Sequence, residues 1–160
     1  MTLTNLNRLP KQEAEDALST CCGSTAWAQR MAALRPYESE KALFALAQVV
    51  WLELSSSDWL EAFSHHPKIG SKTNSEWAAQ EQSGVKSASG NVLKELAEGN
   101  AIYEKRFGHV FLVCATGKSG DEMLELLKKR LSNPPKDELL IAAQEQSKIT
   151  KIRLEKLLRS

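Results

Sequence analysis

The chain has 160 residues, of which 42% are hydrophobic, which suits one compact domain with a core and is too little for two ordinary domains. Its 21 Lys and Arg are balanced by 20 Asp and Glu, and a formal charge of +1 argues against nucleic acid or an anionic membrane as a partner. No apolar run approaches the about 18 residues that a membrane span needs, and no basic segment leads an apolar one at the start. We therefore expect a soluble, cytoplasmic protein with a single domain over residues 1–160.

The cysteines do not form a pattern that is typical of disulfides or of a zinc knuckle. There are 3 of them, Cys21 and Cys22 are adjacent, and no Cys-x-x-Cys occurs. Reduced thiols in a cytoplasm are the expected state. Nothing beside Cys21 or Cys114 in the sequence indicates an activated thiolate, so both are predicted to be core thiols.

The first third of the chain is predicted to be helical. Apolar residues recur three and four positions apart, most clearly over residues 43–54. The first helix should begin near Pro10 and stop at Gly23. Ser24 can cap a second helix, which the proline at position 36 ends, and Ser39 can cap a third.

Two short helices and two loops should follow. Ser57 can cap a short helix that must end near His65, because the residue before Pro67 is biased away from helical angles. Residues 67–74 contain Pro, Gly, Ser and Asn without periodicity, which indicates an ordered loop at a helix C-terminus. A short helix over residues 75–82 and a second loop up to Gly90 complete this part.

The second half carries one long helix, one apolar run and two further helices. A core-facing stripe predicts a helix that ends at Gly108; it consists of Leu93, Leu96, Asn100, Tyr103 and Phe107. Residues 110–114 are continuously apolar, but no second strand signal exists to pair with them. Residues 121–131 and 136–159 are predicted helices. The expected fold is therefore all-α, with one buried extended segment near residues 110–115.

Two sequence features, a glycine-containing turn near residue 117 and the basic residues of the C-terminal part, are better explained by structural roles than by catalysis or ligand binding. Gly117-Lys118-Ser119 looks like the end of a phosphate-binding loop, but Leu112 stands where such a loop needs a glycine. A polar turn, with Ser119 capping the next helix, is the better interpretation.

The basic residues towards the C-terminus alternate with glutamates, which is typical of solvated helix faces with ion pairs. Arg153 is the exception, because it adjoins core-type positions at 152 and 154 and could point inward. The residues assigned to solvated faces include Lys128, Lys129, Arg130, Glu138 and Glu145.

His65 and His66 lie where a helix should stop, next to a stiffening proline. Histidine, with an ordinary pKa of about 6.5, can give and take protons near neutral pH. A metal site would need more ligands, but the remaining histidine is His109 and no His-Glu-x-x-His occurs, so no metal is expected. A surface or structural histidine is the competing interpretation. Glu81 and Gln82 likewise offer an acceptor and an amide at a helix end, or a plain surface carboxylate.

The order of these motifs over nearly the whole chain closely resembles the OHCU decarboxylase family. OHCU is 2-oxo-4-hydroxy-4-carboxy-5-ureidoimidazoline, a late intermediate of urate breakdown. The matching segments are Trp27, Arg35-Pro36, Asp58-Trp59-Leu60-Glu61-Ala62-Phe63, His66-Pro67-Lys68-Ile69-Gly70, Glu81-Gln82 with Gly84, Asn100-x-x-Tyr103-x-x-Arg106-Phe107-Gly108, Phe111-Leu112-Val113-Cys114-Ala115, Arg130-Leu131-x-Asn133, Glu138 and Ile149-x-x-x-Arg153-Leu154.

The resemblance implies an all-helical, often dimeric lyase, so a homodimer is a possible assembly. It implies stereospecific conversion of OHCU to S-allantoin and carbon dioxide without metal or organic cofactor. The family's catalytic residues fall on His66, Glu81 and Arg153. The implied substrate contacts are Pro67, Ala78, Glu81, Gln82, Phe111, Leu112, Val113, Cys114, Ala115 and Arg153. Many members have a serine in place of Ala78, so one hydroxyl contact is missing here.

The chemistry of the implied decarboxylation explains why few catalytic residues are needed. Electrons released with carbon dioxide can flow into the substrate's own C=N group, so the protein need only orient the carboxylate and manage protons. Our hypothesis makes His66 the acid/base and lets Glu81 orient the imidazole or a ureido N–H. Arg153 would bind carbonyls or the anion through its planar fork, and Gln82 would read the ureido group.

Two other interpretations stay open. The chain could be a helical interaction module whose two loops bind a partner peptide, with His66 only a cap. It could also be an enzyme that acts on a related ureido or hydantoin compound. An interaction module has no reason to collect His66, Glu81 and Arg153 around one cavity.

Overall fold

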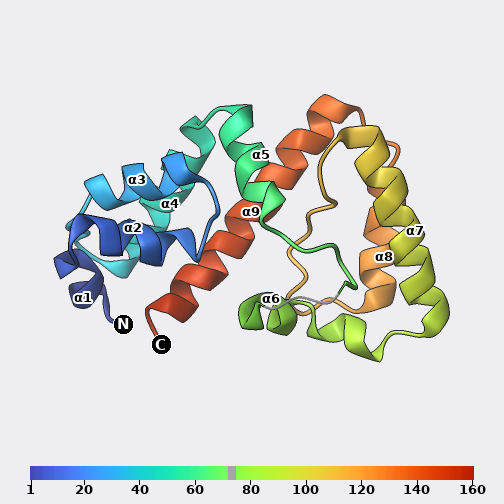
Figure 1. The fold of residues 1–160 in the computed structure, drawn as a ribbon, viewed down its shortest axis with the longest axis horizontal. Helices are drawn as coiled ribbons and strands as arrows, with labels where there is room; N and C mark the ends of the chain where they lie inside the picture. The colour runs from blue at the N-terminus through green and yellow to red at the C-terminus, as the bar shows by residue number, and fades with distance from the viewer. Residues whose placement is uncertain (72–74) are drawn as a thin grey trace. The chain divides into compact units, whose positions relative to one another are not determined.

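The computed structural model describes residues 1–71 and 75–160, and the regular secondary structure of these residues is entirely helical (Figure 1). The all-α prediction is thereby confirmed. The chain forms two compact units: unit 1 consists of Met1–Ala62 and Gln146–Ser160, and unit 2 of Phe63–Glu145. One domain over residues 1–160 stays a prediction. No helix in the described part of the chain is long and apolar enough to cross a membrane.

Unit 1 is built from short amphipathic helices at the N-terminus and the end of the C-terminal helix. The helices are α1 (Leu3–Arg8), α2 (Lys11–Ser19), α3 (Thr25–Ala33), α4 (Glu40–Glu53), α5 (Ser56–Ser64), which continues into unit 2, and the last part of α9 (Pro135–Leu157). Two buried indoles find backbone acceptors: Trp27 Nε1 donates to the Ala47 carbonyl at 3.1 Å, and Trp59 Nε1 to the Trp51 carbonyl at 2.8 Å. Pairing of these polar edges lets the large rings be buried without an orphaned N–H.

Two of the predicted caps in unit 1 are confirmed and one is wrong. Ser24 Oγ accepts from Trp27 N at 3.2 Å, and Ser39 Oγ from Ala42 N at 3.0 Å. Ser57, however, lies inside α5, and Ser55 is the capping residue: its Oγ accepts from Asp58 N at 3.3 Å. Asp58 Oδ2 in turn accepts from Ser55 Oγ at 2.9 Å and from Ser55 N at 3.4 Å, and this reciprocal pairing favours the earlier start.

Unit 2 is built around α7 (Gly90–Phe107) and α8 (Gly120–Arg130), with α6 (Glu76–Glu81), the 3-10 helix η1 (Ser83–Ser87) and the start of α9. Gly108 ends α7 in a left-handed conformation, with φ +79°, as predicted. Residues 83–87 are predicted as loop, but they form η1, whose 5 residues are too few to leave a periodic pattern. The core joins α7 and α8 to the apolar segment; it contains Ile69, Val85, Val92, Leu96, Tyr103, Phe111, Val113, Ala115, Met123, Leu124 and Leu127.

Gly84 is required by a close approach of two backbones within unit 2. A Cβ placed on Gly84 would lie 2.1 Å from the Lys118 carbonyl oxygen. Since backbone cannot move aside as a flexible side chain does, we expect Gly84→Ala to lower the free energy of unfolding by about 1–3 kcal/mol in urea denaturation. Gly90→Ala is the control, because a Cβ at Gly90 meets nothing within 4 Å. Equal stability of the two variants would contradict the prediction.

Candidate active site

The loop after α5 carries His66. The helix ends at Ser64, as predicted, and His66 N donates to the Phe63 carbonyl at 3.1 Å. His66 and Pro67 are half-buried, whereas His65 is exposed. Of the two histidines, His66 is therefore the one that the fold partly withdraws from solvent. Residues 72–74 of the predicted loop lie outside the described part of the chain.

The peptide group between Ile69 and Gly70 is held by two side-chain amides. Asn100 Nδ2, from α7, donates to the Ile69 carbonyl at 3.0 Å, and Gly70 N donates to Gln82 Oε1 at 3.0 Å. Gly70 has a φ of +87°, a conformation that favours glycine. The loop also carries an ion pair between Lys68 Nζ and Glu104 Oε2 at 3.2 Å. Gln82 Oε1 therefore already accepts a hydrogen bond within the protein, and Nε2 is the group through which Gln82 can donate to a ligand.

The predicted short helix after this loop is present as α6, and it buries two of the predicted site residues. Ser75 Oγ caps it by accepting from Ala78 N at 3.2 Å. Ala78 is 3% exposed and Glu81 8% exposed. The alternative of a plain surface carboxylate at Glu81 is therefore wrong. Because little solvent screens a buried side chain, the electrostatic interactions of Glu81 with the groups directly beside it are strong.

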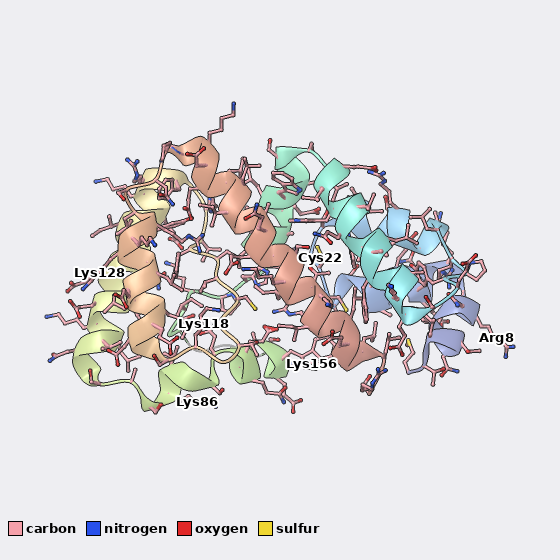
Figure 2. All side chains as sticks on the ribbon, turned by 180° about the vertical axis from the view of Figure 1, so that it is seen from behind. Arg8, Cys22, Lys86, Lys118, Lys128 and Lys156 are labelled. Carbon is pink, nitrogen blue, oxygen red and sulfur yellow. The ribbon has the colours of Figure 1, made fainter. Side chains whose placement is uncertain are left out.

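Residues 111–115 form a buried segment outside any helix or strand, as predicted. All five are buried, and three charged side chains hold the backbone: Glu145 Oε1 accepts from Cys114 N at 3.1 Å, Lys118 Nζ donates to the Cys114 carbonyl at 2.7 Å, and Arg130 Nη1 donates to the Leu112 carbonyl at 2.7 Å. In Figure 2, Lys118 lies at the irregular segment that precedes α8.

Between these anchored groups, the backbone of Val113 is left without a partner. Val113 is 3% exposed, and neither its N–H nor its C=O is paired with any group of residues 1–71 and 75–160. Buried backbone groups are almost always hydrogen-bonded. A donor and an acceptor of one residue, both buried and unpaired, are suited to a flat ligand that offers N–H and C=O groups.

Several charged residues that were predicted on solvated faces are buried in unit 2. Arg130, Glu138 and Glu145 are 7%, 0% and 9% exposed. Arg130 Nε donates to Glu138 Oε1 at 2.7 Å, the Tyr103 hydroxyl also donates to Glu138, and the Arg130 guanidinium lies 4.7 Å from the centre of the Phe111 ring. The prediction failed because alternating charges on one helix suggested pairing along that helix, whereas the actual partners come from other elements.

Arg153 lies in the other unit. It is half-buried on α9, and its charge offsets a small part of the rise that burial causes in the pKa of Cys21 and Cys22. The predicted site residues from 66 to 115 all belong to unit 2, so unit 2 contains every predicted site residue except Arg153. In the described part of the chain, no three His, Cys, Asp or Glu side chains are placed to hold a metal ion.

The thiols are protonated core groups, as predicted. Burial raises the pKa of Cys21 and of Cys22 to about 12, and it also raises the pKa of Cys114. Since the thiolate is the reactive form, we expect alkylation of Cys21 and Cys22 by iodoacetamide at about pH 8 to be at least about a hundredfold slower in the folded chain than in urea. Mass spectrometry of the labelled peptides measures this ratio. Rapid labelling of either residue in the folded chain would contradict the burial argument.

These features define an all-helical protein with a candidate acid/base and small-molecule site in unit 2. Residues 7–155 match the sequence model of the OHCU decarboxylase family, and the chain belongs to this family. It is 40% identical over 151 residues to the uric acid degradation bifunctional protein TTL of Arabidopsis thaliana, covering 89% of this chain and 47% of that protein. It is 32% identical over 91 residues to the 2-oxo-4-hydroxy-4-carboxy-5-ureidoimidazoline decarboxylase of Amia calva, covering 57% of this chain and 52% of that protein.

Among solved structures, the chain is similar to an OHCU decarboxylase crystallised in the presence of (S)-allantoin. The TM-score is 0.82 at 38% identity, over 91% of this chain and 99% of that one. The chain thus spans nearly all of that structure, but only about half the length of the two curated relatives. The predicted resemblance is confirmed.

Proposed function

We propose that the protein decarboxylates OHCU to (S)-allantoin and carbon dioxide without a cofactor. The proposal rests on one observation about a chain that belongs to this family. Its unit 2 contains the His66 loop, the buried Glu81 and the unpaired buried backbone of Val113. The similarity to an OHCU decarboxylase crystallised with (S)-allantoin present supports the choice of substrate and product. The relatives that carry uric acid degradation in their names support the same choice.

The proposed reaction requires proton transfer and orientation rather than an external electron acceptor. The bond from the ring carbon to the carboxylate breaks, its electron pair forms a C=C bond to the ureido-bearing carbon, and the C=N pair moves onto the ring nitrogen, which takes up one proton from solvent. The hydroxyl of the resulting enol then loses its proton and becomes a carbonyl, and the ureido-bearing carbon receives a proton on one face. A single acid/base can serve both transfers if the ring is held in one orientation.

We assign the proton transfers to His66 and the orientation of its imidazole, or of a ureido N–H, to Glu81. The half-buried position of His66 and the burial of Glu81 support these roles. Arg153 would bind the anionic substrate through its planar guanidinium. Gln82 would donate through Nε2 to the ureido carbonyl, because its Oε1 already accepts from Gly70.

The remaining contacts are assigned to a proline, a small side chain and backbone. Pro67 would line the site beside His66, and Ala78 would leave room where many members place a serine hydroxyl. Residues 111–115 would contact the ligand, and Val113 would offer both its N–H and its C=O, because neither takes part in the bonds that hold Leu112 and Cys114 within unit 2.

The cellular context and assembly are also part of the proposal. Three free cysteines suit a reducing cytoplasm. A homodimer is the assembly that the family resemblance implies, and light scattering of the purified chain would measure it. A monomer at micromolar concentration would contradict the dimer without affecting the proposed chemistry.

The decisive assay follows urate oxidation in the presence of a urate oxidase and the succeeding hydrolase, and records the circular dichroism of the allantoin formed. Rapid appearance of the S enantiomer only when this chain is added is the expected result. Slow racemic allantoin in every reaction would contradict the decarboxylase and favour a binding module. Inhibition by added allantoin would separate the decarboxylase from an enzyme of a related hydantoin.

A further inference from the structure

The loop that bears His66 is fixed to unit 2 at one peptide group, and both polar edges of that group are bonded to carboxamide side chains. The Ile69 carbonyl accepts from Asn100, and the N–H of the same peptide, on Gly70, donates to Gln82, each at 3.0 Å. A peptide group is planar, so two hydrogen bonds on opposite edges fix its position and its tilt. We call these two side chains, Asn100 and Gln82, the amide clamp.

The amide clamp joins the two elements that carry the proposed acid/base pair. The clamped peptide begins three residues after His66, and between them stand the rigid Pro67 and the short segment to Ile69, whose side chain is 6% exposed in the core. On the other side, Gln82 is the residue that directly follows Glu81 at the C-terminus of α6. Movement of the clamped peptide would therefore be transmitted to His66 and to the end of the helix that carries Glu81.

Asn100 is an unusual residue for its position. It is 2% exposed within the apolar stripe of α7, and its Oδ1 has no hydrogen-bond partner among the described residues. A buried acceptor without a partner lowers stability, so this side chain is poorly explained as a stabilising core residue. Unpaired buried polar groups occur mainly at functional sites, where a side chain is kept in the position that function requires although the protein is less stable for it.

We infer that Asn100 is a positioning residue for the reaction: through the amide clamp it holds the loop that carries His66 in register with Glu81. This inference rests on the proposed function. Asn100 bonds the loop backbone, so its removal should impair the chemical step more than substrate binding. The ion pair of Lys68 with Glu104 cannot replace it, because exposed ion pairs of this kind, here with side chains 55% and 32% exposed, contribute little.

The test compares Asn100→Leu and Asn100→Asp with Asn91→Leu and Asn91→Asp, whose site is exposed on the same helix. Asp keeps the shape of Asn but, when ionised, has no donor for the Ile69 carbonyl. We expect both Asn100 variants to lose at least about tenfold in kcat with KM changed less than about threefold, because small misplacements of reacting groups are costly. The Asn91 variants should stay near the native kcat.

A second measurement follows exchange of the Gly70 N–H by NMR. Gly70 is exposed, yet its bond to Gln82 should slow exchange at least about a hundredfold relative to an unprotected peptide. The Asn100 variants should lose much of this protection at unchanged protection of the α7 core. Unprotected exchange in the native chain overturns the clamp, even if the Asn100 variants fail to fold.

The outcomes separate the inference from the function on which it rests. Native kcat per folded molecule in Asn100→Leu overturns the positioning role, and so does a loss that appears only in the free energy of unfolding. If the native chain forms no (S)-allantoin, the proposed function fails and the catalytic part of the inference fails with it. Exchange at Gly70 then still decides whether the amide clamp exists.

Discussion

His66→Asn is expected to lower kcat for (S)-allantoin formation by about a hundred- to ten-thousandfold, because general acid/base catalysis typically contributes that much. Asparagine keeps polarity and approximate size but cannot exchange protons near neutral pH. His66 is half-buried on the loop that the amide clamp fixes, so the loss should fall on kcat rather than on folding. The circular dichroism assay described above measures the rate.

His65→Asn is the matched control for this prediction. The two histidines are adjacent, but His65 is exposed. Its replacement should change kcat less than about twofold, since exposed substitutions away from a site rarely matter. Comparable losses of kcat in the two variants would indicate a general effect on the loop. A His66→Asn variant with native kcat would show that His66 is not the acid/base, although the protein catalyses the reaction.

Arg130→Met is expected to lower the free energy of unfolding by about 3–5 kcal/mol, because breaking a buried ion pair leaves an uncompensated charge. Glu138 is fully buried, and Arg130 is the cation that faces it. The same substitution removes the hydrogen bond to the Leu112 carbonyl, so residues 111–115 should loosen as well. Urea denaturation followed by circular dichroism gives the stability.

A surface ion pair on the same helix supplies the control. Lys128 extends from α8 (Figure 2) and lies 3.4 Å from Glu95, with the two side chains 61% and 50% exposed. Lys128→Met should change stability by less than about 1 kcal/mol. The double variant Arg130→Met with Glu138→Leu should recover part of the loss, because it removes the stranded carboxylate. A small effect of Arg130→Met alone would contradict the buried network.

Much of the fold followed from local signals in the sequence. Ser24 and Ser39 cap helices as predicted, and the stripe from Leu93 to Phe107 gives α7 with Gly108 at its end. These features depend on residues within one or two turns of each other, which is the range that periodicity and capping describe. The six-residue α1 was missed because it is too short for a periodic pattern, although Thr2 and Asn5 form a capping box.

The candidate site was predictable only in part. His66 and Glu81 stand at helix ends, where sequence patterns are informative, and the family resemblance assigned their roles. Asn100, Arg130 and Glu145 act on backbone that is 31, 18 and 31 residues away in sequence, so no local pattern could reveal them. One signal was present: Asn100 interrupts an otherwise apolar helix face, and a polar residue there requires a partner.

The anchoring of residues 111–115 has a consequence for how mutations would be tolerated. Main-chain groups supply the bonds of this segment, so any apolar side chains that fit the space would present the same surface to a ligand. The conformation of this segment depends instead on Glu145, Lys118 and Arg130, whose side chains bond its carbonyl and N–H groups. A deep mutational scan should therefore find that 112–114 tolerate apolar residues of similar volume while Glu145, Lys118 and Arg130 tolerate few changes, so that recognition of the proposed ligand would depend on charged residues far away in the sequence.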